Sequence, residues 1–296
     1  MSAKGRKFQG GSGHPRIILQ WKLEDMLSLL ASCERDEATP LMLENLSERC
    51  TVLESGCGAA RYVKYLSDRG HKVIGLEWSQ ETVRMTRQVW PDLNIVSGDA
   101  ASSPFPDATF DVVLSFGVVE HFIEGLGAPL RDIYRVLKPG GRAVITVPCL
   151  NGVRRLKRRT WWYEITTAPR ALAAWVLRRR PMTLTRRKYR QHAVHPSIGE
   201  FFEYRLTTTE FLRELKVVGF NVLRHVPIGH MDGVYHEINP FRMLVRALPG
   251  LIFDSCWLAR FLDHRLRKYP FLHCHMQGAV VQKPAVDCGM SVLSKR

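Results

Sequence analysis

The sequence of 296 residues lacks several patterns that would assign it to a class directly. It contains no run of about 18 consecutive apolar residues, so we expect no membrane-spanning helix. Its seven cysteines are scattered and form no CxxC pair, which argues against a disulfide framework and favours a reducing, cytoplasmic setting. The first residues are polar and rich in glycine, and we expect a flexible lead-in there rather than a signal peptide.

A pattern of metal ligands is also missing. On a strand, His273-Cys274-His275 would place two imidazoles on one face, but no second cluster of ligands accompanies them in the sequence. We therefore expect no metal site.

Acidic residues are nearly absent from one long segment. Residues 151–190 contain thirteen lysines and arginines but one acid, Glu164, a balance of +12 in a chain whose formal net charge is +15. Within this segment, residues 168–180 have the pattern of a helix. Aromatic residues lie among the charges, at Trp161, Trp162, Tyr163, Trp175 and Tyr189. The positive charge therefore belongs to one segment rather than to the whole fold.

The most informative stretch is an apolar run that ends at Glu54 and leads into Gly56-Cys57-Gly58 and a helix-forming segment. This pattern predicts a buried parallel strand that turns sharply into a helix. Glycine tolerates the backbone of a sharp turn and lets a ligand approach closely. We expect amide hydrogens at the start of the helix to point toward that ligand. An ordinary tight turn would give the same glycine pattern.

Two further strands are predicted to end in acids. Residues 72–77 end in Glu77, twenty-one residues after Gly56, a spacing with which a βαβ unit brings a carboxylate to a ribose diol. Residues 94–99 end in Asp99. Three acids are therefore expected along the carboxyl edge of one sheet, where open α/β proteins bind ligands.

Six short motifs follow one another along the chain: Glu54-Ser-Gly-Cys-Gly-Ala-Ala-Arg61, Gly75-Leu-Glu-Trp-Ser79, Gly98-Asp-Ala100, Ser103-Pro-Phe-Pro-Asp-Ala-Thr-Phe-Asp111, Glu120-His-Phe122 and Leu137-Lys-Pro-Gly-Gly141. With them the chain resembles the class I S-adenosylmethionine-dependent methyltransferases, and among these the quinone-biosynthesis and other small-molecule enzymes. The resemblance covers residues 45–150 well and 200–228 more weakly. A dinucleotide fingerprint would need glycine in place of Arg61, so a nicotinamide cofactor is the weaker interpretation.

The resemblance implies a Rossmann-like α/β fold, with a seven-stranded, mostly parallel sheet in the order 3-2-1-4-5-7-6, an antiparallel strand seven and helices on both faces. We expect Ser79, Thr207 or Thr208, and Gly219 to cap helices. Strands are expected at 51–56, 72–77, 94–99, 111–116, 142–148, 220–228 and 276–283. The expected organisation is a tail with lid helices at 1–50, a cofactor-binding core at 51–148, a basic cap insertion at 149–206, the second half of the core at 207–284 with a further insertion at 230–272, and a tail at 285–296.

The resemblance also implies how S-adenosylmethionine would be bound. Glu54 would meet the methionine amino group and Glu77 both ribose hydroxyls, while Asp99 would accept from the adenine amino group. Ala59-Ala60 departs from the family, in which Thr-Gly is frequent. The implied cofactor-binding residues are Glu54, Gly56, Cys57, Gly58, Arg61, Glu77, Trp78, Asp99, Ala100, Phe116 and Gly117.

One histidine near this site is a candidate general base. His121 follows the fourth strand, and an imidazole titrates near neutral pH. Alternatively, it only shapes the pocket or hydrogen-bonds the cofactor. Histidines in or beside the insertions, where the family keeps its acceptor residues, are further candidates: His192, His195, His230 and His236.

The acceptor stays open between three hypotheses. The first is a small-molecule, lipid-linked or glycan-linked acceptor, with residues 151–190 acting as a cap or meeting an anionic membrane surface. The second is RNA, whose backbone and bases would suit basic and aromatic residues. Cys149 lies near the nucleophile position of RNA 5-methylcytosine enzymes, but their Asp-Ala-Pro-Cys motif and the Asn-Pro-Pro-Tyr motif of amino-methylating enzymes are absent. The third is a binding module without catalysis. A cytoplasmic protein, peripheral to the membrane if it meets one, is expected.

Overall fold

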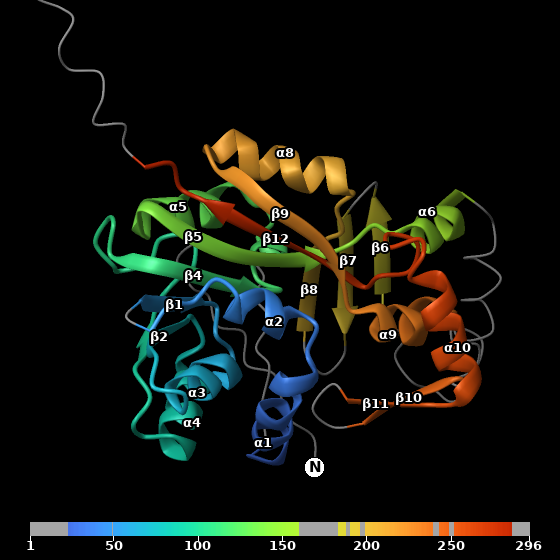
Figure 1. Ribbon diagram of the computed structural model, residues 1–296, viewed down its shortest axis with the longest axis horizontal. Coiled ribbons are helices and arrows are strands. Elements are labelled where there is room, and N and C mark those ends of the chain that lie inside the picture. The colour runs from blue at the N-terminus through green and yellow to red at the C-terminus, as the bar shows by residue number, and fades with distance from the viewer. Residues whose placement is uncertain are drawn as a thin grey trace, which may run out of the picture.

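The computed structural model describes residues 23–48, 50–159, 183–187, 190–195, 199–238, 243–248 and 252–285. Its centre is a seven-stranded sheet in the order β3-β2-β1-β4-β5-β12-β9 (Figure 1). β12 runs antiparallel to both neighbours, so the predicted Rossmann-like order is confirmed. The strands are β1 (Thr51–Ser55), β2 (Lys72–Glu77), β3 (Ile95–Ser97), β4 (Phe110–Phe116), β5 (Leu137–Pro148), β9 (Asn221–Ile228) and β12 (Met276–Gln282).

Helices cover both faces of this sheet (Figure 1). The strands read as nearly continuous apolar runs because alternate side chains enter two separate cores. Val52 and Leu114 pack into one core, whereas Leu53 and Val113 pack into the other. The first core is covered by α1 (Leu23–Ser32), α3 (Arg61–Ser67) and α4 (Gln80–Val89), and the second by α5 (Gly127–Val136) and α8 (Thr208–Val218).

The predicted helix caps are confirmed. The hydroxyl of Ser79 accepts from the Thr82 amide at the start of α4. Thr207 and Glu210 form a reciprocal capping box at the start of α8. The helix ends at Gly219, whose φ of 108° lies in the left-handed region.

Strand β5 differs from the prediction. The strand is predicted over residues 142–148, whereas β5 begins earlier, at Leu137. Phe110 pairs with Leu137 and Val112 with Arg142, so the extra residues of β5 are accommodated as a bulge. The amide of Gly140 donates to the carbonyl of Lys283, and this hydrogen bond keeps the segment beside the sheet.

Two insertions join the core at the carboxyl edge of the sheet. After β5 come α6 (Gly152–Arg159) and an antiparallel sheet of β6 (Thr183–Arg187), β7 (Arg190–His195) and β8 (Gly199–Tyr204). The helix expected at 168–180 lies outside the described residues. After β9 come a short helix α9 (His230–Gly233), a π-helical turn η3 (Val234–Ile238), a hairpin of β10 (Val245–Leu248) and β11 (Ile252–Ser255), and α10 (Trp257–Leu266).

Short helices precede β1. The described ones are α1, a 3-10 turn η1 (Cys33–Arg35) and α2 (Ala38–Leu43). Residues before Leu23 lie outside the described part of the chain. This N-terminal segment, residues 23–43, is called the lid below.

The capping box makes a testable contribution to stability. We expect Thr207→Ala to lower the free energy of unfolding by about 1 kcal/mol, because the substitution removes the hydroxyl that accepts from the Glu210 amide at the start of α8. Urea denaturation followed by circular dichroism measures the change. Thr208→Ala removes the same atoms one residue later and serves as the control. Equal effects of the two substitutions would contradict the assignment of the cap to Thr207.

Candidate functional site

Three acidic residues meet at the carboxyl edge of three adjacent strands. Glu54 lies near the end of β1, Glu77 is the last residue of β2, and Asp99 follows β3 by two residues. β1 and β2 pair in parallel, and so do β2 and β3. The structure therefore brings together on neighbouring strands the acids that the sequence placed at strand ends.

Glu54 is a buried carboxyl group, with 4% of its surface exposed. One of its oxygens accepts a hydrogen bond from the Val63 amide in α3 at 3.1 Å. Burial raises its pKa from 4.5 to about 8, because the positive charge of Arg61 and this hydrogen bond only partly compensate for lost hydration. The folded protein holds this proton more tightly than the unfolded chain, so Glu54 lowers stability as the pH rises from 4.5 to about 8.

Glu77 is held by the backbone of the turn and of the following helix. One oxygen accepts from the Gly58 amide at 3.0 Å, and the other accepts from the Ser79 amide at 2.8 Å. Burial raises the pKa of Glu77 despite these hydrogen bonds. Among the described residues, no lysine or arginine forms an ion pair with Glu54 or Glu77. Each oxygen of Glu77 retains a lone pair that can accept from a hydroxyl group.

Asp99 lies in a tight turn after β3. It is half-buried, and its carboxylate accepts a hydrogen bond from the Ala101 amide at 2.9 Å. Ala100, which follows it, is buried, whereas Trp78, which follows Glu77, is half-buried. These residues are the ones that the sequence assigned to the adenine end of the cofactor.

The glycine turn is hydrogen-bonded within the protein. Of the amides at the start of α3, which were expected to point toward a ligand, that of Val63 donates to Glu54. The amides of Gly56 and Cys57 both donate to the carbonyl of Leu76, at 2.8 and 2.9 Å. The Gly58 amide donates to Glu77. The turn is therefore fastened to β2, and it positions the Glu77 carboxylate rather than offering these three amides to a ligand.

Close packing around the turn explains its small residues. Gly56 has a φ of +78°, and a Cβ atom added there would lie 2.6 Å from both γ carbons of Val118. A Cβ atom on Gly75 would lie 2.8 Å from the sulfur of Cys57. Burial raises the pKa of the Cys57 thiol well above its usual value, so Cys57 acts here as a small packed side chain.

Arg61 connects the turn to the lid. Its guanidinium donates to the carboxylate of Asp36 at 2.7 Å and to the hydroxyl of Ser32 at 3.1 Å. It also lies over the ring of Tyr62, with 4.5 Å between its central carbon and the ring centroid. The sequence assigned Arg61 to the cofactor, and the structure places its side chain between the turn and the lid.

The end of β4 lies beside the ends of β1, β2 and β3 and contributes further residues to this edge. The ring of Phe116 packs on Tyr62 at a centroid distance of 4.9 Å, and Gly117 follows it with a φ of +69°. His121 lies in the 3-10 turn η2 (Val119–His121), and its Nδ1–H donates to the carbonyl of Phe202 at 2.7 Å. This hydrogen bond makes Nε2 the basic nitrogen of the neutral ring.

Glu120 is a site residue that the sequence analysis missed. It is 1% exposed, and its Oε2 has no hydrogen-bond partner among the described residues. Its Oε1 lies 3.9 Å from Nε2 of His121 and would lie 3.5 Å from a Cβ atom added to Gly117. Burial, and secondarily the charge of Glu203, raise its pKa well above the usual range. Its sequence signal was an acid inside the apolar run Gly117–Phe122, which predicts burial.

Histidines gather at the carboxyl ends of β5 and β9, where the second insertion begins. His230 donates to Glu37 of the lid at 3.0 Å, and its ring meets that of His273 at 5.2 Å. His236 stacks on His275 at 4.6 Å. His192 and His195 lie in β7. The structure thus brings His230 and His236 close to two histidines of a different segment, a grouping that the sequence did not predict.

Buried polar groups support the stacked pair. The guanidinium of Arg154 donates to Glu237 at 2.6 Å, to Nδ1 of His275 at 2.7 Å and to the carbonyl of Cys149 at 2.6 Å. Cys149 is 1% exposed, and its thiol hydrogen-bonds that of Cys274. A packed thiol of this kind is poorly placed to attack a nucleic-acid base.

Two features are absent from the described residues. No group of three or more histidine, cysteine, aspartate or glutamate side chains is arranged there to hold a metal ion. No helix there has the length and apolarity to cross a bilayer.

Comparisons with known proteins agree on one family. Residues 53–145 match the family model described as a methyltransferase domain. A probable S-adenosylmethionine-dependent methyltransferase of Mycolicibacterium smegmatis is 35% identical over 111 residues, which cover 36% of this chain and 43% of that protein. A demethylmenaquinone methyltransferase of Streptomyces avermitilis is 35% identical over 95 residues, or 32% of this chain and 40% of that protein. The chain thus spans less than half the length of these curated relatives.

Solved structures share the fold over most of the chain. A methyltransferase from Methanosarcina mazei aligns with a TM-score of 0.54 and 16% identity, covering 83% of this chain and 98% of the other. A putative methyltransferase from Haloferax volcanii, solved with the activator Trm112, aligns with a TM-score of 0.52 and 18% identity, covering 90% and 100%.

The packing around Gly56 predicts an unequal effect of two similar substitutions. Gly70 has a φ of +82° with nothing within 4 Å of an added Cβ, so Gly70→Ala tests the backbone alone and should cost about 1 kcal/mol of stability. Gly56→Ala should cost about 1–3 kcal/mol more, because its Cβ overlaps Val118. Thermal and urea unfolding measure both. Val118→Ala in the Gly56→Ala background should recover part of the loss, and no recovery would refute the overlap.

Proposed function

Because the chain carries a class I S-adenosylmethionine-dependent methyltransferase domain, we propose that it transfers the sulfonium methyl group to a small-molecule, lipid-linked or glycan-linked acceptor. One observation supports the proposal more than any other. Glu54, Glu77 and Asp99 meet on three adjacent strands at the edge where α/β sheets bind ligands, and the first two are buried with no ion-pair partner among the described residues.

The residues at this edge fit the cofactor. A ligand with a positively charged amino group would provide the charge that the Glu54 carboxylate lacks, and a ribose diol would use the remaining lone pairs of Glu77. Trp78 would flank the adenine, with Asp99 and the Ala100 amide at its edge. We propose that Gly56, Cys57 and Gly58 lie beneath the methionine part of the cofactor. Arg61 would hold this turn against the lid through Asp36.

When bound, S-adenosylmethionine supplies a methyl group on a sulfonium ion, which an acceptor attacks in line. The chain has to fix the geometry of the two reactants, an effect that is worth about 7–11 kcal/mol in well-oriented systems. Phe116 and Gly117 lie at the end of β4, beside the turn, and are assigned to the sulfonium end.

We assign the role of general base to His121. Its Nδ1–H is engaged by Phe202, so Nε2 carries the lone pair that can take a proton from the acceptor. Burial raises the pKa of the neighbouring Glu120 carboxyl, whose Oε1 lies 3.9 Å from this nitrogen.

The names of two relatives and the position of the insertions support a small-molecule, lipid-linked or glycan-linked acceptor. One relative is named for demethylmenaquinone, and another, from Pseudescherichia vulneris, is named as a malonyl-[acyl-carrier protein] O-methyltransferase, 31% identical over 112 residues that cover 37% of this chain and 44% of that protein. The proposal includes contact of residues 151–190 with an anionic membrane surface and a cytoplasmic, peripheral location. The described part of that segment comprises α6, β6 and the first residue of β7. RNA is the weaker alternative, because Cys149 is packed against Cys274.

Proton release on cofactor binding tests the role of Glu54. At about pH 7 the group is mostly protonated, because its pKa is about 8, and pairing with an amino group requires the carboxylate. Binding should therefore release about one proton, and affinity should rise between about pH 6 and about pH 8. Calorimetry in two buffers with different heats of protonation measures the release. Glu54→Gln should abolish it. Identical heats in both buffers for the wild-type protein would rule out this role.

Binding and turnover together test the function itself. Glu77→Ala and Asp99→Ala should each weaken S-adenosylmethionine binding at least about tenfold, which corresponds to the net loss of one or two hydrogen bonds to a charged group. Glu81→Ala, at an exposed acid of the neighbouring helix α4, is the matched control and should bind normally. Absence of any binding by the wild-type protein would contradict the proposed enzyme.

Transfer to an acceptor is measured separately. Extracts incubated with the protein and methyl-labelled cofactor should yield a labelled small molecule, lipid or glycan conjugate. His121→Gln should lower the rate while leaving cofactor affinity unchanged, since the residue is assigned to the acceptor. Label recovered only in RNA would favour the alternative function.

A further inference from the structure

Helix α10 exposes large apolar side chains that the methyltransferase core does not need. Trp257 is 71% exposed, Phe261 50% and Leu258 38%. Tyr269, just after the helix, is 65% exposed. Single exposed apolar residues are common on protein surfaces, but a cluster of aromatic ones on one helix marks an interaction site.

Positive charges surround these side chains. Arg260, Arg265 and Lys268 are exposed, and the guanidinium of Arg265 lies 5.5 Å from the centroid of the Phe261 ring. Trp257, Phe261 and Arg265 follow one another at intervals of four residues, which places them on the same side of the helix, and Lys268 follows shortly after its end. The acid within α10, Asp263, is buried, whereas Asp254 in the preceding strand β11 is exposed, so the outward residues of the helix itself carry cations and the nearby carboxylate lies before it.

The inner face of α10 is fastened to the core. Ala259 is fully buried, and Asp263 contacts His273 at 3.2 Å and Arg267 at 2.9 Å. Arg267 also donates to Glu37 of the lid at 2.7 Å. Since Glu37 in turn accepts from His230, the helix is held against the lid and α9. The aromatic face therefore cannot turn inward without breaking these contacts.

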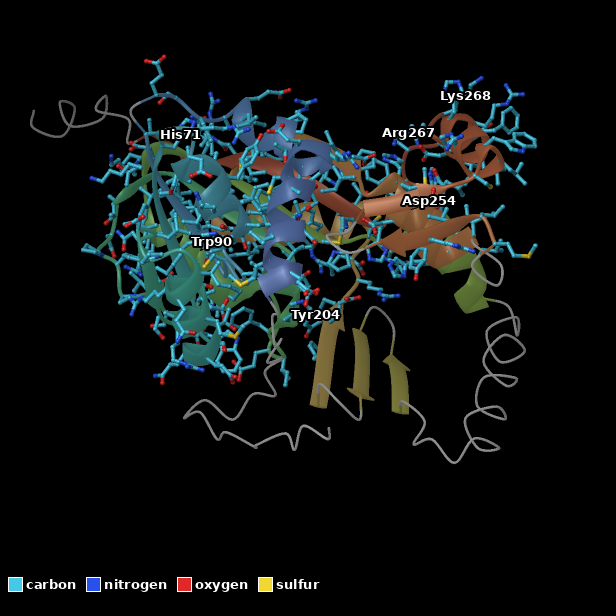
Figure 2. The ribbon with its side chains drawn as sticks, turned by 90° about the horizontal axis from the view of Figure 1, so that it is seen from below. His71, Trp90, Tyr204, Asp254, Arg267 and Lys268 are labelled. Carbon is cyan, nitrogen blue, oxygen red and sulfur yellow. The ribbon has the colours of Figure 1, made fainter. Side chains whose placement is uncertain are left out.

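The basic segment that begins at residue 151 starts beside this helix. The amides of Gly152 and Val153 donate to the carbonyls of Phe271 and Leu272, at 3.0 and 2.9 Å, a few residues after α10. On the first turns of α6, Leu156 is 64% exposed. Helices α6 and α10 lie at the same end of the molecule (Figure 1), and Arg267 and Lys268 lie at the outer margin of that end (Figure 2).

We propose that α10 docks the protein on an anionic lipid bilayer, with Trp257, Phe261 and Tyr269 among the headgroups and Arg260, Arg265 and Lys268 facing lipid phosphates. Tryptophan and tyrosine place an apolar ring and a polar tip at such an interface, and long basic side chains extend from it toward water. The charge of the face is complementary to acidic lipids. A protein partner would instead need a surface lined with carboxylates opposite these cations.

Docking through α10 extends the proposed function. It rests on that function in one respect: the bilayer would supply a lipid-linked acceptor. The inner contacts of α10 reach Glu37, which neighbours Asp36, the partner of Arg61 at the cofactor turn. Docking through α10 would thus orient the lid side of the molecule and its cofactor edge relative to the membrane.

Vesicle sedimentation of the full chain tests the proposal. The protein should sediment at low salt with phosphatidylcholine vesicles that contain phosphatidylglycerol, and much less with phosphatidylcholine alone. The triple variant Arg260→Gln, Arg265→Gln, Lys268→Gln should lose about a hundredfold in partitioning. The double variant Trp257→Ala, Phe261→Ala should lose about tenfold or more and remove the salt-resistant part of binding.

A matched control comes from helix α8, which also exposes an apolar residue among cations. Val217 is 76% exposed, and Arg213 and Lys216 are exposed beside it. The variant Val217→Ala, Arg213→Gln, Lys216→Gln should bind vesicles like the wild-type protein. All variants should bind S-adenosylmethionine with unchanged affinity, which separates a failure of docking from a failure of the proposed function.

Several outcomes would overturn docking through α10. The wild-type protein could bind S-adenosylmethionine yet remain in the supernatant with both kinds of vesicle. The α10 variants could sediment as well as the wild-type protein, which would assign binding to residues 151–190. The same variants could lose RNA binding or dissociate a dimer in analytical ultracentrifugation while vesicle binding is unaffected, which would assign the face to RNA or to a second copy.

Discussion

The structure depends on two carboxyl groups buried at the sheet edge, for which the described residues provide no ion-pair partner. Glu54 and Glu77 accept hydrogen bonds from backbone amides, and burial raises the pKa of both. Burying such groups costs the free protein stability. Under the proposed function, a ligand with a positive charge and hydroxyl groups would offset part of this cost. Gly56 in the turn and Gly75 in β2 let β1, β2 and Val118 approach closely.

Charged contacts extend from this edge across the molecule. Arg61 joins the cofactor turn to Asp36, and the neighbouring Glu37 joins the lid to His230 and Arg267. Burial alone would raise the pKa of Glu37, but the hydrogen bonds from His230 and Arg267 lower it to about 2, so this carboxylate stays charged over the whole physiological range. The lid, the cap at α9 and the outer helix α10 are therefore held in one arrangement around the edge of the sheet.

Local signals made the core predictable from sequence, and distant contacts made the rest unpredictable. The apolar runs, the acids at their ends and the caps at Ser79 and Thr207 each depend on a few consecutive residues, and the strand order was implied by the family resemblance. The pairing of Arg61 with Asp36 joins residues 25 positions apart, and that of Glu37 with Arg267 joins residues 230 apart. The hydrogen bonds of the Gly56 and Cys57 amides could not be predicted from sequence, because their acceptor, the carbonyl of Leu76, lies on another strand. Gly140 in β5 likewise hydrogen-bonds Lys283, which lies far from it in the sequence.

The most direct test of the central claim is a crystal structure of the protein with S-adenosylhomocysteine. We expect the nucleoside to lie across the ends of β1, β2 and β3, with both ribose hydroxyls on Glu77, the amino group near Glu54 and the adenine beside Asp99. A nucleoside bound elsewhere, or an edge filled by the protein's own side chains so that these three carboxylates contact no ligand, would contradict it.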